Sequence, residues 1–381
     1  MKIIVSTHDS LCPIKGGGAL RTLKCAEEFK KRGHEVTLIA PADGVGELSG
    51  IKLHWLHAPR KQRSQILSSI KFNVRLFRKF LQFAGATEMF FVHNTIAAAT
   101  LPFLRRFYSF KFVLDITDIH AEYLAAARRN IVEKLLTPLI LFVEYWIINN
   151  ADRIIVVTRA MKELLIKNGI AASKIDVVYD AAEIDKIASE KEAGSEKAVL
   201  HLGTVDRQQG VELFISAIPL VAAAHPEARF LIVGGGRELE NVIKLSEKLG
   251  VRGVCVFTDY LPCDEARKYL ARAAIGVIPR QDELPNRIVT TLKIYEYWAG
   301  GLAVVSSRLE GIAEIAKDGR DILFFQPGSA GDMAKKIIRL LEDPGLTAKL
   351  ARQGSLTVAK YTWSGAAPKI ADAALKAASP V

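Results

Sequence analysis

The residues best suited to chemistry stand in one short segment of the second half of the chain. Thr290 and Thr291 precede an expected helix, and Glu296 lies early in it. Backbone N–H groups at a helix N-terminus bind phosphate groups, so this segment is suited to hold a diphosphate. The Glu296 carboxylate would then be placed to accept hydrogen bonds from a ribose diol. In isolation, a carboxylate on a helix surface is the simpler interpretation, so the rest of the sequence must decide.

Two runs of glycine follow expected strands. Residues 16–18 stand before a helix expected over 19–31, and residues 234–236 follow the strand 230–233. Without a Cβ atom, such residues let backbone N–H groups approach a phosphate or a sugar. The first run lacks the spacing of a dinucleotide fingerprint or a Walker loop, so NAD and ATP binding lose support. A flexible loop without a ligand is the alternative for the first run, and the second run alone is a weak signal.

His93 and Asn94 end another expected strand and are suited to hydrogen-bond a sugar, although a lone histidine also fits a structural role. No cluster of His, Cys and carboxylate residues has metal-ligand spacing, so we expect no metal. The four cysteines form no CxxC pair and no secretory leader is recognisable, which predicts a cytoplasmic protein. The apolar stretch 135–148 contains Pro138 and Glu144 and falls short of the roughly 20 residues of a membrane span. We predict a buried helix there.

Short β-branched runs alternate with helical patterns along the whole chain. Strand–helix alternation indicates a parallel sheet covered on both faces, and its repetition indicates two doubly wound, Rossmann-like α/β domains. Such sheets carry ligands at the carboxyl ends of their strands, so a cleft between the domains is the expected active site. The expected strands are 3–6, 35–39, 90–92, 112–115, 153–157, 198–202, 229–233, 254–257, 275–278 and 303–306.

Length and charge agree with two domains of different character. The 381 residues suggest two domains, and the composition excludes collagen, coiled coil and bulk disorder. We place the first domain at 1–180, a polar linker at 181–197 and the second domain at 198–364, with a final helix at about 365–381 packing back on the first. The formal charge of +11 is uneven: residues 1–180 hold 26 Lys and Arg against 16 Asp and Glu, and the remainder hold 26 against 25. The first domain is therefore suited to an anionic partner.

The basic excess centres on residues 48–87, which contain eight Lys and Arg and no acidic residue. On a helical wheel, residues 66–83 place apolar side chains over most of the circumference and basic ones on a narrow arc. We predict that the basic arc meets an anionic membrane while part of the apolar arc enters it, so that the protein is peripheral on the inner face. A core helix with a solvated basic face is the alternative, and nucleic acid fits poorly because no nucleic-acid-binding module accompanies the charge. The membrane-facing residues would be Lys71, Arg75, Arg78 and Lys79.

Taken together, the motifs resemble the family 4 glycosyltransferases, retaining enzymes with the two-domain GT-B fold. Nearly the whole chain takes part, and the order and spacing of the motifs are specific. They are Gly33-His34-Glu35-Val36-Thr37, the segments 151–158, 201–211, 230–236 and 256–262, Lys293-Ile294-Tyr295-Glu296-Tyr297, and Tyr361-Thr362-Trp363.

The resemblance implies that the second domain binds a UDP- or GDP-sugar, which is a substrate rather than a cofactor. Glu296 matches the second glutamate of the family's E-x7-E motif, which holds the ribose, and the loop 290–293 matches the stretch whose amides contact the diphosphate. The loop 257–261, with Tyr260, would flank the base. The remaining donor-binding residues on this basis are Gly17, Gly18, Gly203, Arg207, Gly234, Thr290, Thr291 and Lys293.

Three departures from the family pattern matter. The first glutamate of E-x7-E falls at Ile288, the family's basic pair falls at Thr204 and Gln209, and its Asn-Gly reads Asp180-Ala181. Some members share the Lys-x-x-Glu-Tyr variant, so we interpret the chain as one of a subgroup. The diphosphate still needs about two charge-assisted contacts. We choose Arg207 and Lys293, with Arg280 and Arg287 in reserve.

On the acceptor side, Asp118 matches the family's strand-end motif, and His120 is a candidate to replace the imidazole that the family often has there. With Glu296 these are the expected catalytic residues, and His93, Asn94 and Asp118 would bind the acceptor. The expected reaction transfers a sugar, with retention, to a glycan or lipid-linked acceptor in cell-envelope or polysaccharide biosynthesis. A nucleotide-sugar 2-epimerase, which would need further active-site carboxylates, and a non-catalytic binding homologue are the alternatives.

Overall fold

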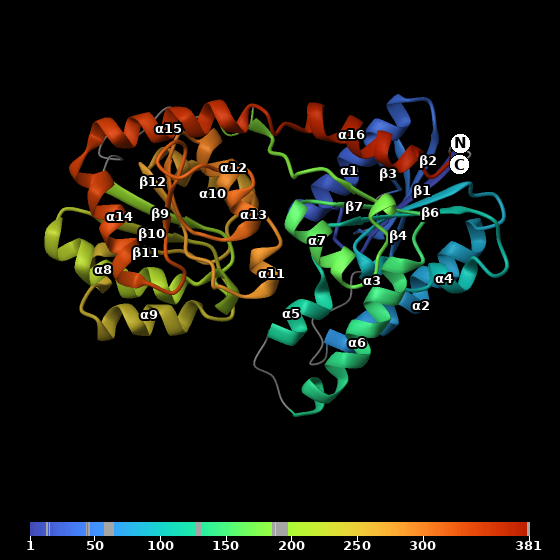
Figure 1. Ribbon diagram of the computed structural model, residues 1–381, viewed down its shortest axis with the longest axis horizontal. Coiled ribbons are helices and arrows are strands. Elements are labelled where there is room, and N and C mark those ends of the chain that lie inside the picture. Colours follow the sequence, from blue (N-terminus) through green and yellow to red (C-terminus); the bar gives the residue numbers. More distant parts are fainter. Residues whose placement is uncertain are drawn as a thin grey trace. The chain divides into compact units, whose positions relative to one another are not determined.

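The chain divides into two compact units, seen in the computed structural model in Figure 1. Unit 1 comprises Met1–Asp180 and Trp363–Val381, and unit 2 comprises Ala181–Thr362. The structure describes residues 1–378 except 13, 15, 43, 45, 57–64, 127–130, 185, 186 and 188–196. The predicted linker belongs to unit 2 where it is described, and most of it lies outside the described residues. The final helix starts at Trp363 and belongs to unit 1.

Unit 1 is built on an eight-stranded sheet in the order β3-β4-β2-β1-β5-β6-β7-β8. All neighbouring strands are parallel except β3 and β4. Every residue of β5 is buried, as expected for a parallel sheet covered on both faces. The strands are β1 (Lys2–Thr7), β2 (Glu35–Pro41), β3 (Glu47–Leu48), β4 (Ile51–Leu56), β5 (Met89–His93), β6 (Lys111–Ile116), β7 (Arg153–Val156) and β8 (Ile175–Val177).

Helices cover both faces of this sheet. α1 (Gly16–Lys31) packs against α16 (Trp363–Leu375) on one face, and α2, α4 and α6 lie on the other (Figure 1). This division follows from right-handed crossovers, because the chain moves one way from β1 to β2 and the opposite way from β4 to β5. The helices of the second group are α2 (Gln65–Phe83), α3 (Thr95–Ala98), α4 (Leu101–Leu104), α5 (His120–Ala126), α6 (Ile131–Asn149) and α7 (Arg159–Lys167).

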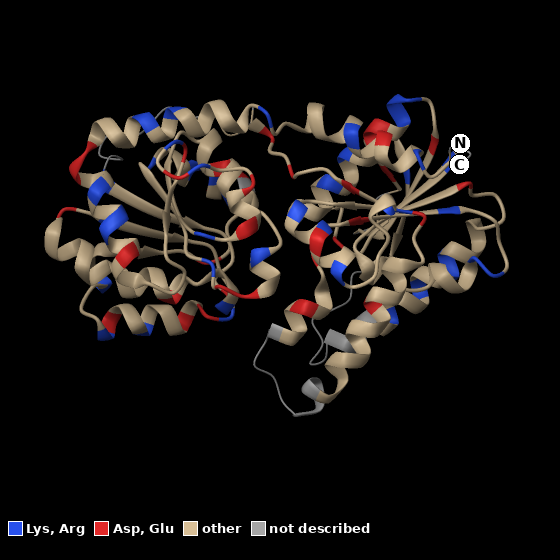
Figure 2. Ribbon diagram, in the orientation of Figure 1, with Lys and Arg blue, Asp and Glu red and all other residues tan. Residues whose placement is uncertain are grey.

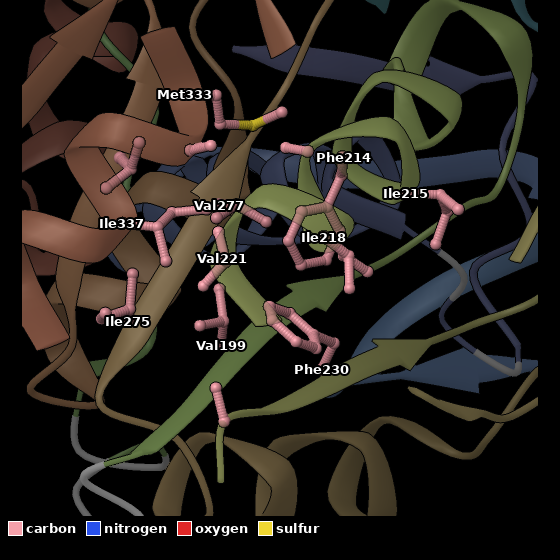
Figure 3. Close-up of a cluster of buried hydrophobic side chains, with 14 of the residues drawn as sticks. Val199, Phe214, Ile215, Ile218, Val221, Phe230, Ile275, Val277, Met333 and Ile337 are labelled. Carbon is pink, nitrogen blue, oxygen red and sulfur yellow. The ribbon is translucent and has the colours of Figure 1, made fainter. Parts of the chain in front are cut away.

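Unit 2 is built on a six-stranded parallel sheet in the order β11-β10-β9-β12-β13-β14. Its core joins Phe214 of α8 to Phe230 of β10 and to Met333 and Ile337 of α14 (Figure 3). The strands are β9 (Ala198–Leu202), β10 (Arg229–Val233), β11 (Cys255–Phe257), β12 (Ile275–Ile278), β13 (Ala303–Ser307) and β14 (Leu323–Phe325). The helices are α8 (Val211–Ala224), α9 (Leu239–Lys248), α10 (Cys263–Ala271), α11 (Leu284–Arg287), α12 (Leu292–Ala299), α13 (Glu310–Ala313), α14 (Ala330–Glu342) and α15 (Pro344–Val358).

The ten predicted strands are all present, and the prediction of two Rossmann-like α/β units is confirmed. The strands that the sequence did not predict are β3, β4, β8 and β14. β3, β8 and β14 have three residues or fewer, and β4 interrupts its apolar residues with Lys52 and His54.

The prediction of a buried helix over 135–148 is only half correct. The segment is helical, but Leu135, Leu139 and Phe142 are 74%, 59% and 69% exposed. An apolar helix can cover the sheet with one face and still carry apolar residues on the other. Within the described part of the chain, no helix is long and apolar enough to cross a membrane.

The close approach of β9 and β10 at their carboxyl ends gives a test of the unit 2 fold. Gly234 has φ +129°, and a Cβ there would lie 2.2 Å from the carbonyl oxygen of Gly203. We expect Gly234→Ala to lower the free energy of unfolding by about 3 kcal/mol, from backbone strain and overlap together. Gly250→Ala is the matched control, because Gly250 also has positive φ but no atom within 4 Å of the added Cβ, and should cost about 1 kcal/mol. Equal losses in urea denaturation would contradict this.

Candidate functional site

In unit 2 the polar groups gather where β9 and β10 end and α12 begins. Gly203 has φ +122°, and a Cβ there would lie 2.7 Å from Cε of Lys293. The glycine therefore makes room for the lysine, whose Nζ donates to Oε1 of Gln209. Lys293 is only 9% exposed. The ammonium group of Lys293 thus lies beside Gln209, the position at which the family's second basic side chain would fall.

The position of α12 is fixed by its buried aromatic side chains. The Tyr297 hydroxyl oxygen accepts from the backbone N–H of Leu202 at 2.8 Å, and Trp298 Nε1 donates to the backbone oxygen of Asp321 at 2.9 Å. These bonds tie the helix to the end of β9 and to the loop before β14. Lys293 and Glu296, three residues apart on this helix, are therefore presented on a rigid element.

The surroundings of Lys293 are positively charged. Burial and the nearby Arg280 guanidinium lower the pKa of Lys293 to about 7, while Glu296 opposes this shift. Arg280 is itself buried, and its Nε and Nη1 have no hydrogen-bond partner within the described residues; the same holds for the Thr290 hydroxyl. Burial and the Lys293 charge lower the pKa of His201 to about 3, so that this ring is neutral. Two cations and a hydroxyl beside a helix N-terminus are suited to bind an anion.

Glu296 lies at the edge of this group and is half-buried. Burial raises the pKa of its carboxyl group, while Arg267 and Lys293 lower it. Thr291 begins α12 but its side chain makes no capping hydrogen bond. Tyr260 is 66% exposed on the loop after β11, and Gly235 packs against its ring. The structure thus places six of the predicted donor-binding residues together in unit 2, around the ends of β9 and β10 and the start of α12. They are Gly203, Gly234, Thr290, Thr291, Lys293 and Glu296.

Two of the arginines considered for the diphosphate are engaged elsewhere. Arg207 donates from Nη2 to Oε1 of Glu283 at 2.8 Å, and Arg287 pairs with Asp282. A cavity of about 470 Å³ lies between the loop before α8 and helix α9, and Arg207 is the predicted donor residue among its lining residues. Of the reserve cations, Arg280 alone is buried beside Lys293.

In unit 1 a buried ionic network lies under the ends of β1, β5 and β6. Arg21 of α1 donates from Nε and Nη2 to the two oxygens of Asp115, both at 2.8 Å, and from Nη1 to Asp180 at 3.1 Å. His93 Nδ1 lies 3.0 Å from Asp115 Oδ2. Burial alone would raise the pKa of Asp115, but Arg21 and His93 hold it well below its usual range. The Asp115 carboxylate thus fixes the orientation of the His93 ring.

Gly18 and Asn94 allow the segments around His93 to pack closely. A Cβ on Gly18 would lie 2.3 Å from Asp9 Oδ2 and 2.6 Å from His93 Nε2, so glycine is required there. Asn94 has φ +61° and accepts the backbone N–H of Thr117 at Oδ1, at 2.9 Å. Asn94 therefore joins the ends of β5 and β6. Gly17 and Gly18 form the first turn of α1 in unit 1.

The predicted catalytic pair lies directly after β6. Asp118 accepts from the Tyr123 hydroxyl at 2.9 Å. His120 begins α5, and its ring contacts that of His8 edge to face, with centroids 5.2 Å apart. Burial and then His8 lower the pKa of His120 to about 4, so the ring is a neutral proton acceptor at pH 7. Glu144 of α6 accepts the backbone N–H groups of His120 and Ala121 at 3.1 and 2.6 Å and holds the loop.

Sequence reasoning missed Arg21, His8, Asp9 and the roles of Asp115 and Glu144. Arg21 lies on an expected helix, where the sequence pattern does not distinguish it from a solvent-exposed cation. Its partner Asp115 lies 94 residues away in the sequence. Asp115 ends a strand beside the predicted motif, which was the one available signal. No group of three or more His, Cys, Asp and Glu in the described residues is arranged to hold a metal ion.

The basic residues predicted to face a membrane lie on α2. Lys71, Arg75 and Arg78 are exposed and Lys79 is half-buried, while Phe72, Leu76 and Phe80 of the same helix are buried. The helix therefore has a packed face and a basic outer face. Membrane association stays a prediction.

Comparison with known proteins decides the class of enzyme. The family described as Glycosyltransferase Family 4 matches residues 15–186, and that described as Glycosyl transferases group 1 matches residues 196–343. An uncharacterized glycosyltransferase of Methanocaldococcus jannaschii is 25% identical over 390 residues, covering 96% of each chain. The chain is a glycosyltransferase of the family 4 type.

One further relative agrees with this assignment, and a solved structure agrees with the fold. The lipopolysaccharide core biosynthesis glycosyltransferase LpsE of Rhizobium meliloti is 29% identical over 182 residues, which is 48% of each chain. The crystal structure of Anabaena HepE in complex with UDP and glucose superposes with a TM-score of 0.77 over 98% of both chains, at 18% identity. The predicted GT-B fold is confirmed. This glycosyltransferase therefore has the expected pair of Rossmann-like units.

The low pKa of Lys293 predicts a specific pH dependence of stability. Between pH 7 and the ordinary lysine pKa of 10.5, the unfolded chain binds a proton at Lys293 that the folded protein has released. The free energy of unfolding of the parent, relative to that of Lys293→Met, should therefore rise with pH across this interval, by at most about 1.4 kcal/mol per pH unit. Denaturant titrations from pH 6 to 10 measure this difference. A difference that does not change with pH would show that Lys293 titrates normally.

Proposed function

We propose that this glycosyltransferase transfers a sugar, with retention, from a UDP- or GDP-sugar to a glycan or lipid-linked acceptor in cell-envelope polysaccharide biosynthesis. The observation that carries the proposal is a pair of buried cations that interact electrostatically: Lys293 in the first turn of α12 and Arg280 after β12. Such a site is costly to leave without an anion, and a diphosphate supplies the matching charge.

In this proposal Lys293 and Arg280 replace the family's basic pair, which falls at Thr204 and Gln209 in this chain. The unpaired Nε and Nη1 of Arg280 would bind phosphate oxygens, and Lys293 would exchange its Gln209 partner for another. Arg207 is the weaker candidate because Glu283 already neutralises it. The cations stabilise the charge that develops on the nucleoside diphosphate as it leaves. The chain would thus belong to a Lys-x-x-Glu-Tyr subgroup.

Glu296 would accept hydrogen bonds from the ribose diol, and Tyr260 would lie beside the base. The Glu296 carboxyl group is half-buried, and burial raises its pKa, while the nearby Arg267 and Lys293 favour the ionised form that accepts hydrogen bonds from a diol. The glycine ends of β9 and β10 would let the nucleotide approach the backbone. The complex of Anabaena HepE with UDP and glucose supports a uridine nucleotide.

The polar group of unit 1 would bind the acceptor. Asp118 offers carboxylate oxygens to sugar hydroxyls, and neutral His120 is able to accept a proton. His93 and Asn94 are 0% and 3% exposed, so they would support the loop after β6 from beneath. In the transfer, the bond between the anomeric carbon and the diphosphate oxygen breaks and a bond to the acceptor oxygen forms. The acceptor hydroxyl proton passes to His120 or to the departing phosphate. The relationship to LpsE, which acts in lipopolysaccharide core biosynthesis, supports an envelope glycan as acceptor.

Glu296→Gln tests the ribose assignment while keeping the shape of the side chain. We expect UDP to bind about ten- to a hundredfold more weakly, because one or two hydrogen bonds to a charged group are lost. The parent should bind UDP more tightly than 2′,3′-dideoxy-UDP, and this preference should disappear in Glu296→Gln. Calorimetric titration of both nucleotides measures the coupling. Glu247→Gln, on the exposed side of α9, is the control.

If Glu296→Gln keeps the preference for UDP over the dideoxy analogue, the ribose assignment is wrong. If the parent binds no nucleoside diphosphate, the proposed function fails as a whole.

A further inference from the structure

α6 has an apolar face that no part of the described chain covers. Leu135, Leu139 and Phe142 follow one another at spacings of four and three residues, so they lie on one face of the helix. They are 74%, 59% and 69% exposed, and Leu136 and Val143 beside them are also exposed. Five large exposed apolar side chains within nine residues form a continuous patch.

The patch extends onto α4 and the turn that follows it. Phe103 is 55% exposed and its ring contacts Trp146 of α6, with centroids 5.2 Å apart. Phe107 is 80% exposed. By contrast, the exposed large hydrophobic residues of unit 2 are isolated from one another along the chain, as at Leu220 and Leu356. Grouped exposure of this kind marks an interaction surface, whereas isolated exposed residues do not.

Positive charge lies on the same side of the sheet as the patch. α3 packs against both α2 and α6, so these two helices lie on the same side of the sheet (Figure 1). α2 exposes Lys71 and Arg78, and it also exposes Ile70, Val74 and Leu81 on one helix face. Basic residues mark α2 in Figure 2, and residues 48–87 contain no Asp or Glu. An exposed apolar patch on the same side of the sheet as an exposed basic helix matches an anionic lipid surface.

The opposite face of α6 reaches the acceptor side of the site. Glu144 points inward and is 5% exposed, and it accepts the backbone N–H groups of His120 and Ala121. Tyr145 of the same helix donates to Glu122 at 3.1 Å. One helix therefore carries the exposed apolar patch outside and holds the loop of His120 inside.

We propose that the α6 patch, with the basic edge of α2, docks this protein on an anionic bilayer and thereby brings the His120 loop to a lipid-linked acceptor. The docking surface stands on the exposed residues alone, while the acceptor class rests on the proposed function. About 0.8 kcal/mol per buried CH₂ makes two or three large side chains sufficient for reversible binding when cations assist.

The test compares vesicles of phosphatidylglycerol and phosphatidylethanolamine with vesicles of phosphatidylcholine, using the full chain. The double variant Leu139→Glu, Phe142→Glu should bind the anionic vesicles at least about tenfold more weakly than the parent. The matched control is Leu220→Glu, Leu356→Glu in unit 2, which changes the charge equally at residues of 52% and 57% exposure and should bind as the parent does. UDP binding should be unchanged in both.

Transfer to a lipid-linked acceptor in vesicles should fall in the α6 variant, while transfer to a detergent-solubilised acceptor should not. The docking surface is wrong if the parent does not sediment with anionic vesicles, or if the α6 variant binds them as the parent does. A parent dimer that the α6 variant converts to a monomer would also overturn it, because a second copy would then cover the patch. Vesicle binding without UDP binding would refute the proposed function and leave the docking surface standing.

Discussion

The proposed donor site of unit 2 depends on the burial of the Lys293 ammonium group. Lys293 lies under the glycine end of β9, and its bonded partner is the neutral amide oxygen of Gln209. A second cation, Arg280, lies near it with hydrogen-bonding capacity unused. Burying like charges together is unfavourable, and the lowered pKa of Lys293 expresses this cost. A bound anion would remove this cost, so the arrangement favours binding of an anionic ligand.

In unit 1, by contrast, the protein's own carboxylates neutralise the buried cation. Arg21 is also fully buried, but Asp115 and Asp180 neutralise it and His93 completes the network. The charges there are satisfied within the protein, and their effect is to orient His93. The groups left at the strand ends include the neutral ring of His120, with its low pKa, and the carboxylate of Asp118. Such a surface suits sugar hydroxyls better than a phosphate, which agrees with the proposed division of labour between the units.

Sequence alone predicted the features that depend on local pattern. Apolar runs located all ten predicted strands, and the helix expected after Thr291 is present and carries Glu296. Features that depend on distant partners could not be predicted. Whether Arg207 or Arg280 is available for an anion is decided by Glu283, which lies 76 residues from Arg207.

The exposure of α6 was also beyond the sequence pattern. The segment 135–148 is apolar on all sides, so periodicity gives no indication of which face is packed. The tertiary structure decides, because Glu144 turns inward to the loop of His120 and leaves Leu135, Leu139 and Phe142 outside. The apolar character of a residue thus does not predict its burial when a buried polar contact fixes the rotation of the helix.

The affinity for UDP of single cation-to-methionine variants tests the central claim most directly. The account predicts that Lys293→Met and Arg280→Met each weaken binding about tenfold or more, because each removes a charge-assisted contact. Arg207→Met and Arg287→Met, whose guanidinium groups are paired with Glu283 and Asp282, should bind close to the parent. A larger loss in Arg207→Met than in Arg280→Met, or no loss in Lys293→Met, would contradict it.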